Sequence, residues 1–124
     1  MRDESVLKKF SALYVEDNKL MRDSIGRIIR RRFGEVYIAE NGKEGLELYI
    51  KYKPNIVITD VEMPVMDGIT MIKKIRAVKE TQSIIITTAY EDDEHTDSSC
   101  VNLIKPVEAE RLIDAIFECL GCGR

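Results

Sequence analysis

Carboxylate, hydroxyl and amino side chains occur in this sequence at positions where together they could bind a phosphoryl group and a metal ion. Each follows a short apolar segment rich in β-branched residues, the kind of segment that forms a buried strand of a parallel sheet. Parallel strands present their carboxyl ends at one edge of the sheet, so these side chains are expected to converge there. The residues are Glu16, Asp17, Asp60, Thr88 and Lys105.

The three acids of this set indicate a site for a divalent cation. Carboxylates held close together repel one another, and one of them would bind a proton unless a cation were present. Mg²⁺ prefers carboxylate oxygens and retains several of its waters. Lys105 would add positive charge, and Thr88 a hydroxyl donor, to oxygens of a dianionic phosphoryl group. A lone acid at a strand end is more often a helix cap, so the prediction depends on the joint occurrence of all five residues.

Length and composition restrict the class of protein. The 124 residues suit a single domain over 1–124 with a core at about 10–121, and 44% apolar and 33% charged residues are typical of a globular protein. The net charge of -3 favours neither nucleic acid nor an anionic membrane as a partner. No apolar segment is long enough to span a bilayer or placed to act as a leader, so a cytoplasmic location is expected.

The cysteines do not form a recognisable framework. Cys100, Cys119 and Cys122 are odd in number, which disfavours a set of disulfides. The C-x-x-C of Cys119 and Cys122 has no second pair, and the only histidine is His95. A structural zinc site needs four ligands, so neither a metal nor a redox role is predicted for this pair.

Strands and helices are expected to alternate along the chain. Asn18 and Asn41 are predicted to cap the first two long helices, and Pro54 to end the second. Gly45 is expected to weaken that second helix by about 1 kcal/mol relative to alanine, and the third is expected to begin near Gly68. Strands are predicted at 10–15, 36–39, 55–60, 83–88 and 101–104, and a final helix near 112–120. The residues predicted to face inward from the two middle helices are Leu46, Tyr49, Ile50, Ile69, Ile72, Ile75 and Val78.

The polar face of the first long helix is strongly basic. No aromatic residues are interleaved with its arginines, so we interpret it as a solvated face and not as a surface that binds RNA or lipid. These residues are Arg22, Arg27, Arg30, Arg31 and Arg32. The alternation of strands and helices, with strands apolar on both faces, predicts a parallel sheet between two layers of helices.

Four segments resemble the receiver domain of two-component response regulators, in its chemotaxis-regulator-like form. They are 13–18 (LYVEDN), 60–68 (DVEMPVMDG), 88–89 (TA) and 105–106 (KP), and the resemblance extends over about residues 10–121. The segment 60–68 is the most specific of them. The resemblance implies an α/β, flavodoxin-like, doubly wound sheet of five parallel strands in the order 2-1-3-4-5.

The resemblance also implies a role for each candidate residue. Asp60 would accept a phosphoryl group from a sensor histidine kinase or a phosphotransfer protein. Asp17 and Asp60 would bind Mg²⁺ directly and Glu16 through water, with the backbone carbonyl of Glu62 as a further ligand. The domain would be a signalling switch and not an enzyme, and would control an output protein or domain that the sequence does not identify, without direct binding to nucleic acid or membrane.

The phosphoryl oxygens would be bound by the remaining residues. The resemblance implies that Thr88 bonds one oxygen and moves toward it on phosphorylation, and that Lys105 pairs with another. The bond between Lys105 and Pro106 would be cis, which proline tolerates. Tyr90, two residues past Thr88, would slow hydrolysis by obstructing water.

Two features depart from the family pattern. Asn102 stands where the family usually has an aromatic residue that rotates inward. The stretch 91–99 is acidic and lacks helical periodicity, so the family's fourth helix is expected to be short or missing. Output is therefore expected to pass through the loop 90–99, ordered or disordered by the phosphoryl group.

Two other classes of function share some of these residues. A phosphohydrolase with an aspartyl nucleophile would place two aspartates after the first strand, and turnover of a generic phosphate ester would reveal it. An interaction module that is never phosphorylated could use the same fold. Loss of a mass increase with acetyl phosphate in Asp60→Asn would separate that module from a phosphorylated switch.

Overall fold

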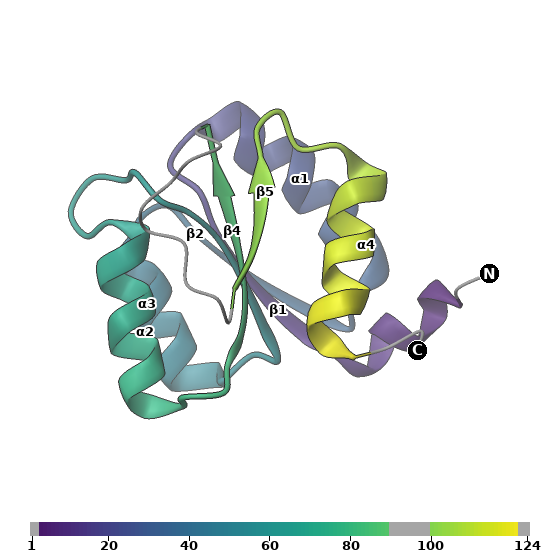
Figure 1. Cartoon of the computed structure of the whole chain (residues 1–124), viewed down its shortest axis with the longest axis horizontal. Helices are drawn as coiled ribbons and strands as arrows, with labels where there is room; N and C mark the ends of the chain where they lie inside the picture. Colours follow the sequence, from purple (N-terminus) through teal and green to yellow (C-terminus); the bar gives the residue numbers. More distant parts are fainter. Residues whose placement is uncertain (1–2, 90–99, 122–124) are drawn as a thin grey trace.

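The computed structural model describes residues 3–89 and 100–121, which form a five-stranded parallel sheet between two layers of helices (Figure 1). The strand order is β2-β1-β3-β4-β5, which confirms the predicted order and the flavodoxin-like fold. All four pairings are parallel, so every strand ends at the same edge of the sheet. The strands are β1 (Ser11–Val15), β2 (Glu35–Ala39), β3 (Ile56–Asp60), β4 (Ser83–Thr88) and β5 (Cys100–Ile104).

The helices begin where short polar side chains cap them. Asn18 and Asn41 accept backbone N–H bonds from three residues further on, as predicted, and Asp67 does the same for the third helix. The predicted short or missing helix between β4 and β5 falls on 90–99, outside the described residues. The helices are the 3₁₀ helix η1 (Glu4–Lys9) and the α-helices α1 (Lys19–Arg32), α2 (Gly42–Tyr52), α3 (Gly68–Val78) and α4 (Ala109–Leu120).

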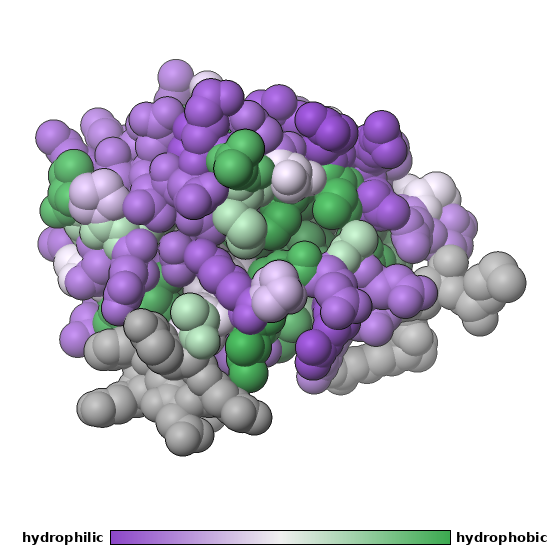
Figure 2. Space-filling view, turned by 90° about the horizontal axis from the view of Figure 1, so that it is seen from above, coloured by the Kyte–Doolittle hydropathy of each residue, from purple (hydrophilic) through white to green (hydrophobic). Residues whose placement is uncertain are grey.

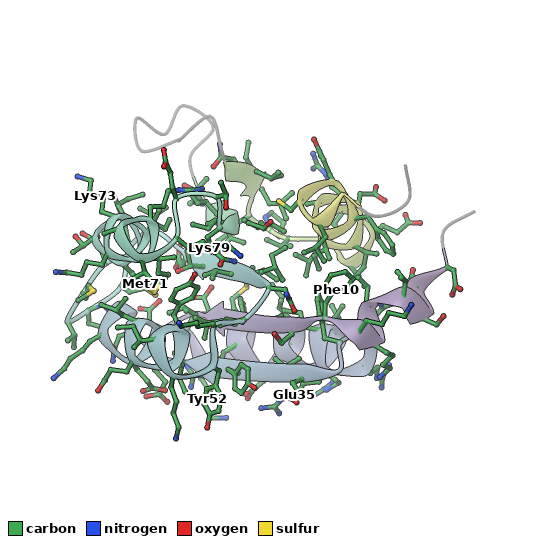
Figure 3. The ribbon with its side chains drawn as sticks, turned by 90° about the horizontal axis from the view of Figure 1, so that it is seen from below. Phe10, Glu35, Tyr52, Met71, Lys73 and Lys79 are labelled. Carbon is green, nitrogen blue, oxygen red and sulfur yellow. The ribbon has the colours of Figure 1, made fainter. Side chains whose placement is uncertain are left out.

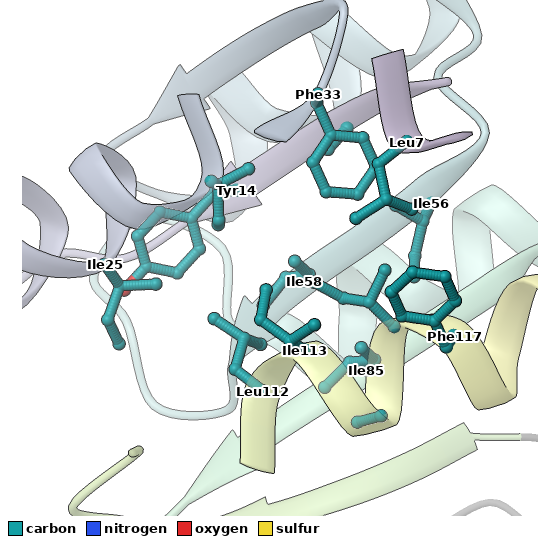
Figure 4. Close-up of a cluster of buried hydrophobic side chains, with 14 residues drawn as sticks. Leu7, Tyr14, Ile25, Phe33, Ile56, Ile58, Ile85, Leu112, Ile113 and Phe117 are labelled. Carbon is teal, nitrogen blue, oxygen red and sulfur yellow. The ribbon is translucent and has the colours of Figure 1, made fainter. Parts of the chain in front are cut away.

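Two apolar clusters hold the layers together. The first lies between the sheet and the helices α1 and α4, and contains Tyr14, Ile58, Ile85, Ile113 and Phe117 (Figure 4). The second lies on the other face, where side chains of alternate strand positions pack against α2 and α3. The strand β3 is buried at all five positions, as expected for a strand that begins with three apolar β-branched residues. Within the described residues, no helix has both the length and the apolar character needed to cross a bilayer.

The buried face of α2 differs from the predicted one. It consists of Gly42, Gly45 and Tyr49, while Ile50 is 53% exposed, so the inward orientation predicted for Ile50 is wrong. A Cβ atom on Gly45 would lie 2.8 Å from both Val15 Cγ2 and Met71 Sδ. Gly45 therefore lets α2 approach β1 closely, and this packing offsets its low helix propensity.

The prediction for the end of α3 is also wrong in one position. Val78 is the last residue of the helix and is 54% exposed, whereas Ile72 and Ile75 are buried as predicted. Helical periodicity continues through Val78, but the apolar surface available for packing does not extend that far.

A buried polar contact links α2 to the start of β4. The Tyr49 hydroxyl donates to Oε1 of Gln82 at 2.7 Å, and the two residues are 1% and 2% exposed. Replacing Tyr49 by phenylalanine leaves this buried amide oxygen without its donor, so we expect Tyr49→Phe to lower the free energy of unfolding by about 1–2 kcal/mol. Urea denaturation would measure it. The control Tyr52→Phe, at a 43% exposed position, should change stability by less than about 0.5 kcal/mol.

Candidate functional site

The acids that follow β1 are held differently from each other. Glu16 is fully buried, and its Oε2 accepts the backbone N–H of Asn18 at 3.1 Å. Asp17 is exposed and lies immediately before Asn18, the residue that caps α1. The end of β1 and the first turn of α1 thus fix the two acids at the edge of the sheet where all strands end. Most of the molecular surface seen in Figure 2 is hydrophilic, with a patch of apolar side chains near the middle of the view.

Arg22 supports these acids from α1, which the sequence analysis did not predict. Its Nη1 donates to the backbone carbonyl oxygens of Glu16 at 3.0 Å and of Asp17 at 3.1 Å, and its Nη2 lies 3.2 Å from Glu40 Oε1. The side chain is only 14% exposed, so the prediction that Arg22 belongs to a solvated face is wrong. An amphipathic pattern cannot identify an arginine that folds back over its own helix terminus.

Asp60 is the last residue of β3 and is 8% exposed. Its Oδ1 accepts the Val61 N–H at 2.7 Å, and its Oδ2 accepts a hydrogen bond from Lys105 Nζ at 3.0 Å. One carboxylate oxygen from each of Glu16, Asp17 and Asp60 lies within 4.8 Å of the others. The structure therefore brings together the three acids that the sequence analysis selected.

Lys105 reaches the same cluster from β5. Its Nζ lies 3.3 Å from Glu16 Oε1 as well as 3.0 Å from Asp60 Oδ2, so one ammonium group bridges two acids from different strands. Its backbone N–H donates to the carbonyl oxygen of Thr88 at 2.7 Å, which ties the ends of β4 and β5 together. Thr88 itself is 3% exposed. The bond from Lys105 to Pro106 is cis, as the resemblance implied.

Glu62 and Asn102, which the sequence analysis also singled out, are both exposed. Glu62 lies two residues past β3, and Asn102 is a residue of β5. Met71 is completely buried in the second apolar cluster. Tyr90 and the loop 90–99 lie outside the described residues.

The C-x-x-C pair can be followed only at its first member. Cys119 is half-buried and its Sγ lies 3.7 Å from the carbonyl oxygen of Ile84, while Cys122 lies outside the described residues. Among the described residues, the group of potential metal ligands that forms a cluster is the one at Asp60.

Burial and the neighbouring charges shift the pKa values of Glu16 and Lys105. Burial raises the pKa of Glu16 to about 6 and the charge of Asp60 acts in the same direction, against the Asn18 N–H and Lys105, which lower it. For Lys105, burial lowers the pKa, but the hydrogen bond to Asp60 and the charges of Asp60 and Glu16 outweigh it, so its pKa is raised overall. Lys105 therefore stays positively charged, while ionised Glu16 is unfavourable in the metal-free protein.

This cost gives a prediction for Glu16→Gln. A rise in pKa from 4.5 to about 6 corresponds to about 2 kcal/mol that ionised Glu16 removes from the stability of the fold. The folded state binds the proton more tightly than the unfolded state, so the penalty is absent below about pH 4.5, grows through this window, and is complete above about pH 6. We expect Glu16→Gln to raise the unfolding free energy of the metal-free protein by about 1–2 kcal/mol at neutral pH.

Denaturation at several pH values would test this expectation. The gain should disappear below about pH 4.5, where the carboxyl is protonated in both states. Glu47→Gln, at an exposed position of α2, is the matched control and should change stability by less than about 0.5 kcal/mol at every pH. A gain that did not depend on pH would contradict the electrostatic explanation.

The donor set fits magnesium. Three carboxylates supply hard oxygen ligands, and Lys105 alone leaves their negative charge incompletely balanced. The exposed Asp17 gives access to solvent, which suits an ion that keeps several waters. Residues Glu16, Asp17 and Asp60 are therefore the ones that could hold the ion.

Comparison with known proteins agrees with this geometry. The profile of the family "Response regulator receiver domain" matches residues 12–117. The chemotaxis protein CheY of Bacillus subtilis is 32% identical over 115 residues, which are 88% of this chain and 96% of CheY. The uncharacterized transcriptional regulatory protein YesN of the same organism is 30% identical over 120 residues, which are 90% of this chain but only 33% of YesN.

A solved structure shows the same fold. The CheY-like receiver domain protein from Methanospirillum hungatei superimposes with a TM-score of 0.81 at 26% identity, over 90% of this chain and 94% of that one. The family profile covers most of the chain and CheY is matched over nearly its whole length. The chain therefore belongs to the response regulator receiver family, the signalling domains of two-component systems.

Proposed function

We propose that this chain is a phosphorylation-controlled switch in which Asp60 accepts a phosphoryl group from a sensor histidine kinase or a phosphotransfer protein. The observation that carries the proposal is the position of the Asp60 carboxylate, which lies within 4.8 Å of two further acids and 3.0 Å from Lys105 Nζ. An acid that only ends a strand would need neither the neighbouring carboxylates nor the lysine.

In the proposed reaction, a carboxylate oxygen of Asp60 attacks the phosphorus of a phosphohistidine. A new oxygen–phosphorus bond forms, the phosphorus–nitrogen bond breaks, and its electron pair stays with the imidazole. The Val61 N–H bonded to Oδ1 and the Lys105 ammonium at Oδ2 hold the plane of the carboxylate for this attack. Positioning of this kind and fixed positive charge supply most of the catalysis of phosphoryl transfer.

Magnesium would be held by the carboxylates of Glu16, Asp17 and Asp60, with the backbone carbonyl of Glu62 as a further proposed ligand. When bound, the ion supplies positive charge that neutralises the phosphoryl oxygens. Lys105 would exchange part of its contact with the two acids for a phosphoryl oxygen, and the Thr88 hydroxyl would donate to another. These roles of Thr88 and Lys105 are supported by their places at the ends of β4 and β5.

The switch follows from the charge that phosphorylation adds, about -1.5 to -2 near neutral pH. Such a charge shifts the domain between two conformations only as far as it interacts differently with them. The output would be a partner protein or an attached domain. The relatives differ in how much of their length lies outside the match, because this chain covers 96% of CheY and 33% of YesN. The proposed site of action is the cytoplasm, where ATP-dependent kinases form phosphohistidine.

Treatment with acetyl phosphate and Mg²⁺, followed by mass spectrometry of the intact protein, tests the proposal. We expect the mass to increase by one phosphoryl group, and EDTA to prevent the increase. Mg²⁺ should also stabilise the wild-type protein more than Glu16→Gln, because the ion relieves the repulsion that the substitution has already removed. Phosphorylation that proceeds equally in EDTA would refute the magnesium site.

A further inference from the structure

A hollow of about 500 Å³ lies along α1 where this helix faces the edge strand β2. Arg27, Arg30 and Arg31 line it from the helix, and Ile38 lines it from β2. The helix α1 lies on the opposite face of the sheet from α2 and α3 (Figure 1). We name this feature the α1–β2 groove; Asp60 is not among its lining residues.

Arg22 also lines the α1–β2 groove, and the other three arginines differ from it because they have no ion-pair partner among the described residues. Lys19, Arg22 and Arg32 of the same helix pair with Asp23, Glu40 and Glu4, respectively. Arg27, Arg30 and Arg31 are exposed and form no ion pair within the part of the chain that the structure describes. Asp23 also lines the groove, but it is already bonded to Lys19 at 2.9 Å. The groove therefore has a cationic rim that Asp23 and Glu40 neutralise only in part.

The floor of the groove is apolar and is opened by a glycine. A Cβ atom on Gly26 would lie 3.1 Å from Ile38 Cδ1, so a larger side chain at this position would fill the space above the strand. Ile38 is half-buried, and an apolar group could seat against it from solvent. A ligand suited to this shape has an apolar side chain between groups of negative charge.

We propose that the α1–β2 groove binds an acidic peptide segment of a partner protein, with an apolar side chain against Ile38 and flanking carboxylates on Arg27 and Arg30. Planar guanidinium groups bind carboxylates through paired hydrogen bonds, which gives geometric selectivity as well as charge. The overall charge of -3 does not prevent this contact, because salt screens charges beyond about 8 Å at physiological ionic strength.

Other polyanions fit the groove less well. Single-stranded nucleic acid binds on aromatic platforms as well as on positive charge, and none of the aromatic residues that the structure describes lines the α1–β2 groove. Tyr37 and Tyr52 lie in a separate hollow, stacked on each other with ring centroids 4.2 Å apart. Glu35 also lines that hollow, and Figure 3 labels Tyr52 and Glu35. A membrane surface needs apolar side chains that protrude, whereas Ile38 lies at the bottom of a charged rim.

The test measures binding of a fluorescein-labelled peptide in which a central leucine is flanked on both sides by glutamate and aspartate. We expect the double substitution Arg27→Glu with Arg30→Glu to weaken binding by about tenfold or more. Lys73→Glu with Lys74→Glu, which makes the same change of net charge on exposed positions of α3, should weaken binding by no more than about twofold. The same peptide with glutamine and asparagine in place of the acids should not bind.

Several results would overturn the proposal. The first is that the acidic peptide does not bind to the wild-type protein. The second is that the two charge-reversed variants lose binding equally. The third is that polyuridylate or phosphatidylserine vesicles bind more tightly than the peptide. Thermal melting and phosphorylation by acetyl phosphate should match the wild type in both variants, since none of the four residues belongs to the Asp60 site. If the glutamate variant does not fold, Arg27→Gln with Arg30→Gln gives the same comparison.

Discussion

Replacement of Asp60 by asparagine is expected to abolish phosphorylation by acetyl phosphate, so that the intact mass stays at its unmodified value. The amide removes the nucleophilic oxygen and one of the negative charges of the cluster, while it preserves the size of the side chain. The Val61 N–H can still donate to the amide oxygen, so the end of β3 keeps its geometry. Phosphorylation should therefore be lost completely, while the free energy of unfolding stays within about 1–2 kcal/mol of the wild-type value.

Asp67→Asn is the matched control for this experiment. Asp67 lies at the end of the loop that joins β3 to α3, is exposed, and caps α3 by accepting the Thr70 N–H at 2.7 Å. Asparagine caps helices as well as aspartate does, so this variant should fold and be phosphorylated like the wild type. A phosphoryl group on the Asp60→Asn protein, located by peptide mapping on another acid, would show that the cluster has a different acceptor.

The site could be predicted from the sequence because its residues follow strands that are easy to identify. The segment 56–59 is β-branched at every position and begins with three apolar residues, and β3 is buried at every position. Once the strands are known to be parallel, the residues that follow them must share one edge. The side-chain contacts could not be predicted in the same way. Lys105 Nζ contacts both Glu16 and Asp60, and these distances do not follow from the spacing of the residues along the chain.

The wrong predictions of buried and exposed positions arise where the type of a residue does not indicate what packs around it. Periodicity centred the inner face of α2 on Leu46, Tyr49 and Ile50, because glycine contributes nothing to a hydrophobic pattern. The helix instead packs through Gly42 and Gly45, which turns Ile50 outward. Close approach of backbones selects glycine for its size, and only the structure shows which backbones approach each other.

The same reasoning gives the second large effect, which is expected at Gly68, the first residue of α3. A Cβ atom at this position would lie 2.0 Å from the carbonyl oxygen of Asp60 and 3.2 Å from Val61 Cα. Both neighbours are backbone atoms, so no change of rotamer can relieve the overlap, and either α3 or the end of β3 must move. We expect Gly68→Ala to lower the free energy of unfolding by about 3 kcal/mol or more.

The displacement should also be visible at the site, because the Gly68 N–H donates to the Val61 carbonyl oxygen at 2.8 Å and Val61 in turn donates to Asp60 Oδ1. Phosphorylation by acetyl phosphate should therefore slow in whatever fraction of Gly68→Ala remains folded. Gly26→Ala is the control, since its Cβ would meet only the end of the Ile38 side chain at 3.1 Å, while alanine improves helix propensity by about 1 kcal/mol. Urea denaturation of the two variants separates the effect of the backbone overlap from that of helix propensity. If Gly68→Ala were as stable as the wild type, the end of β3 could move without a loss of stability. The close contact at Gly68 would then not be what positions Asp60.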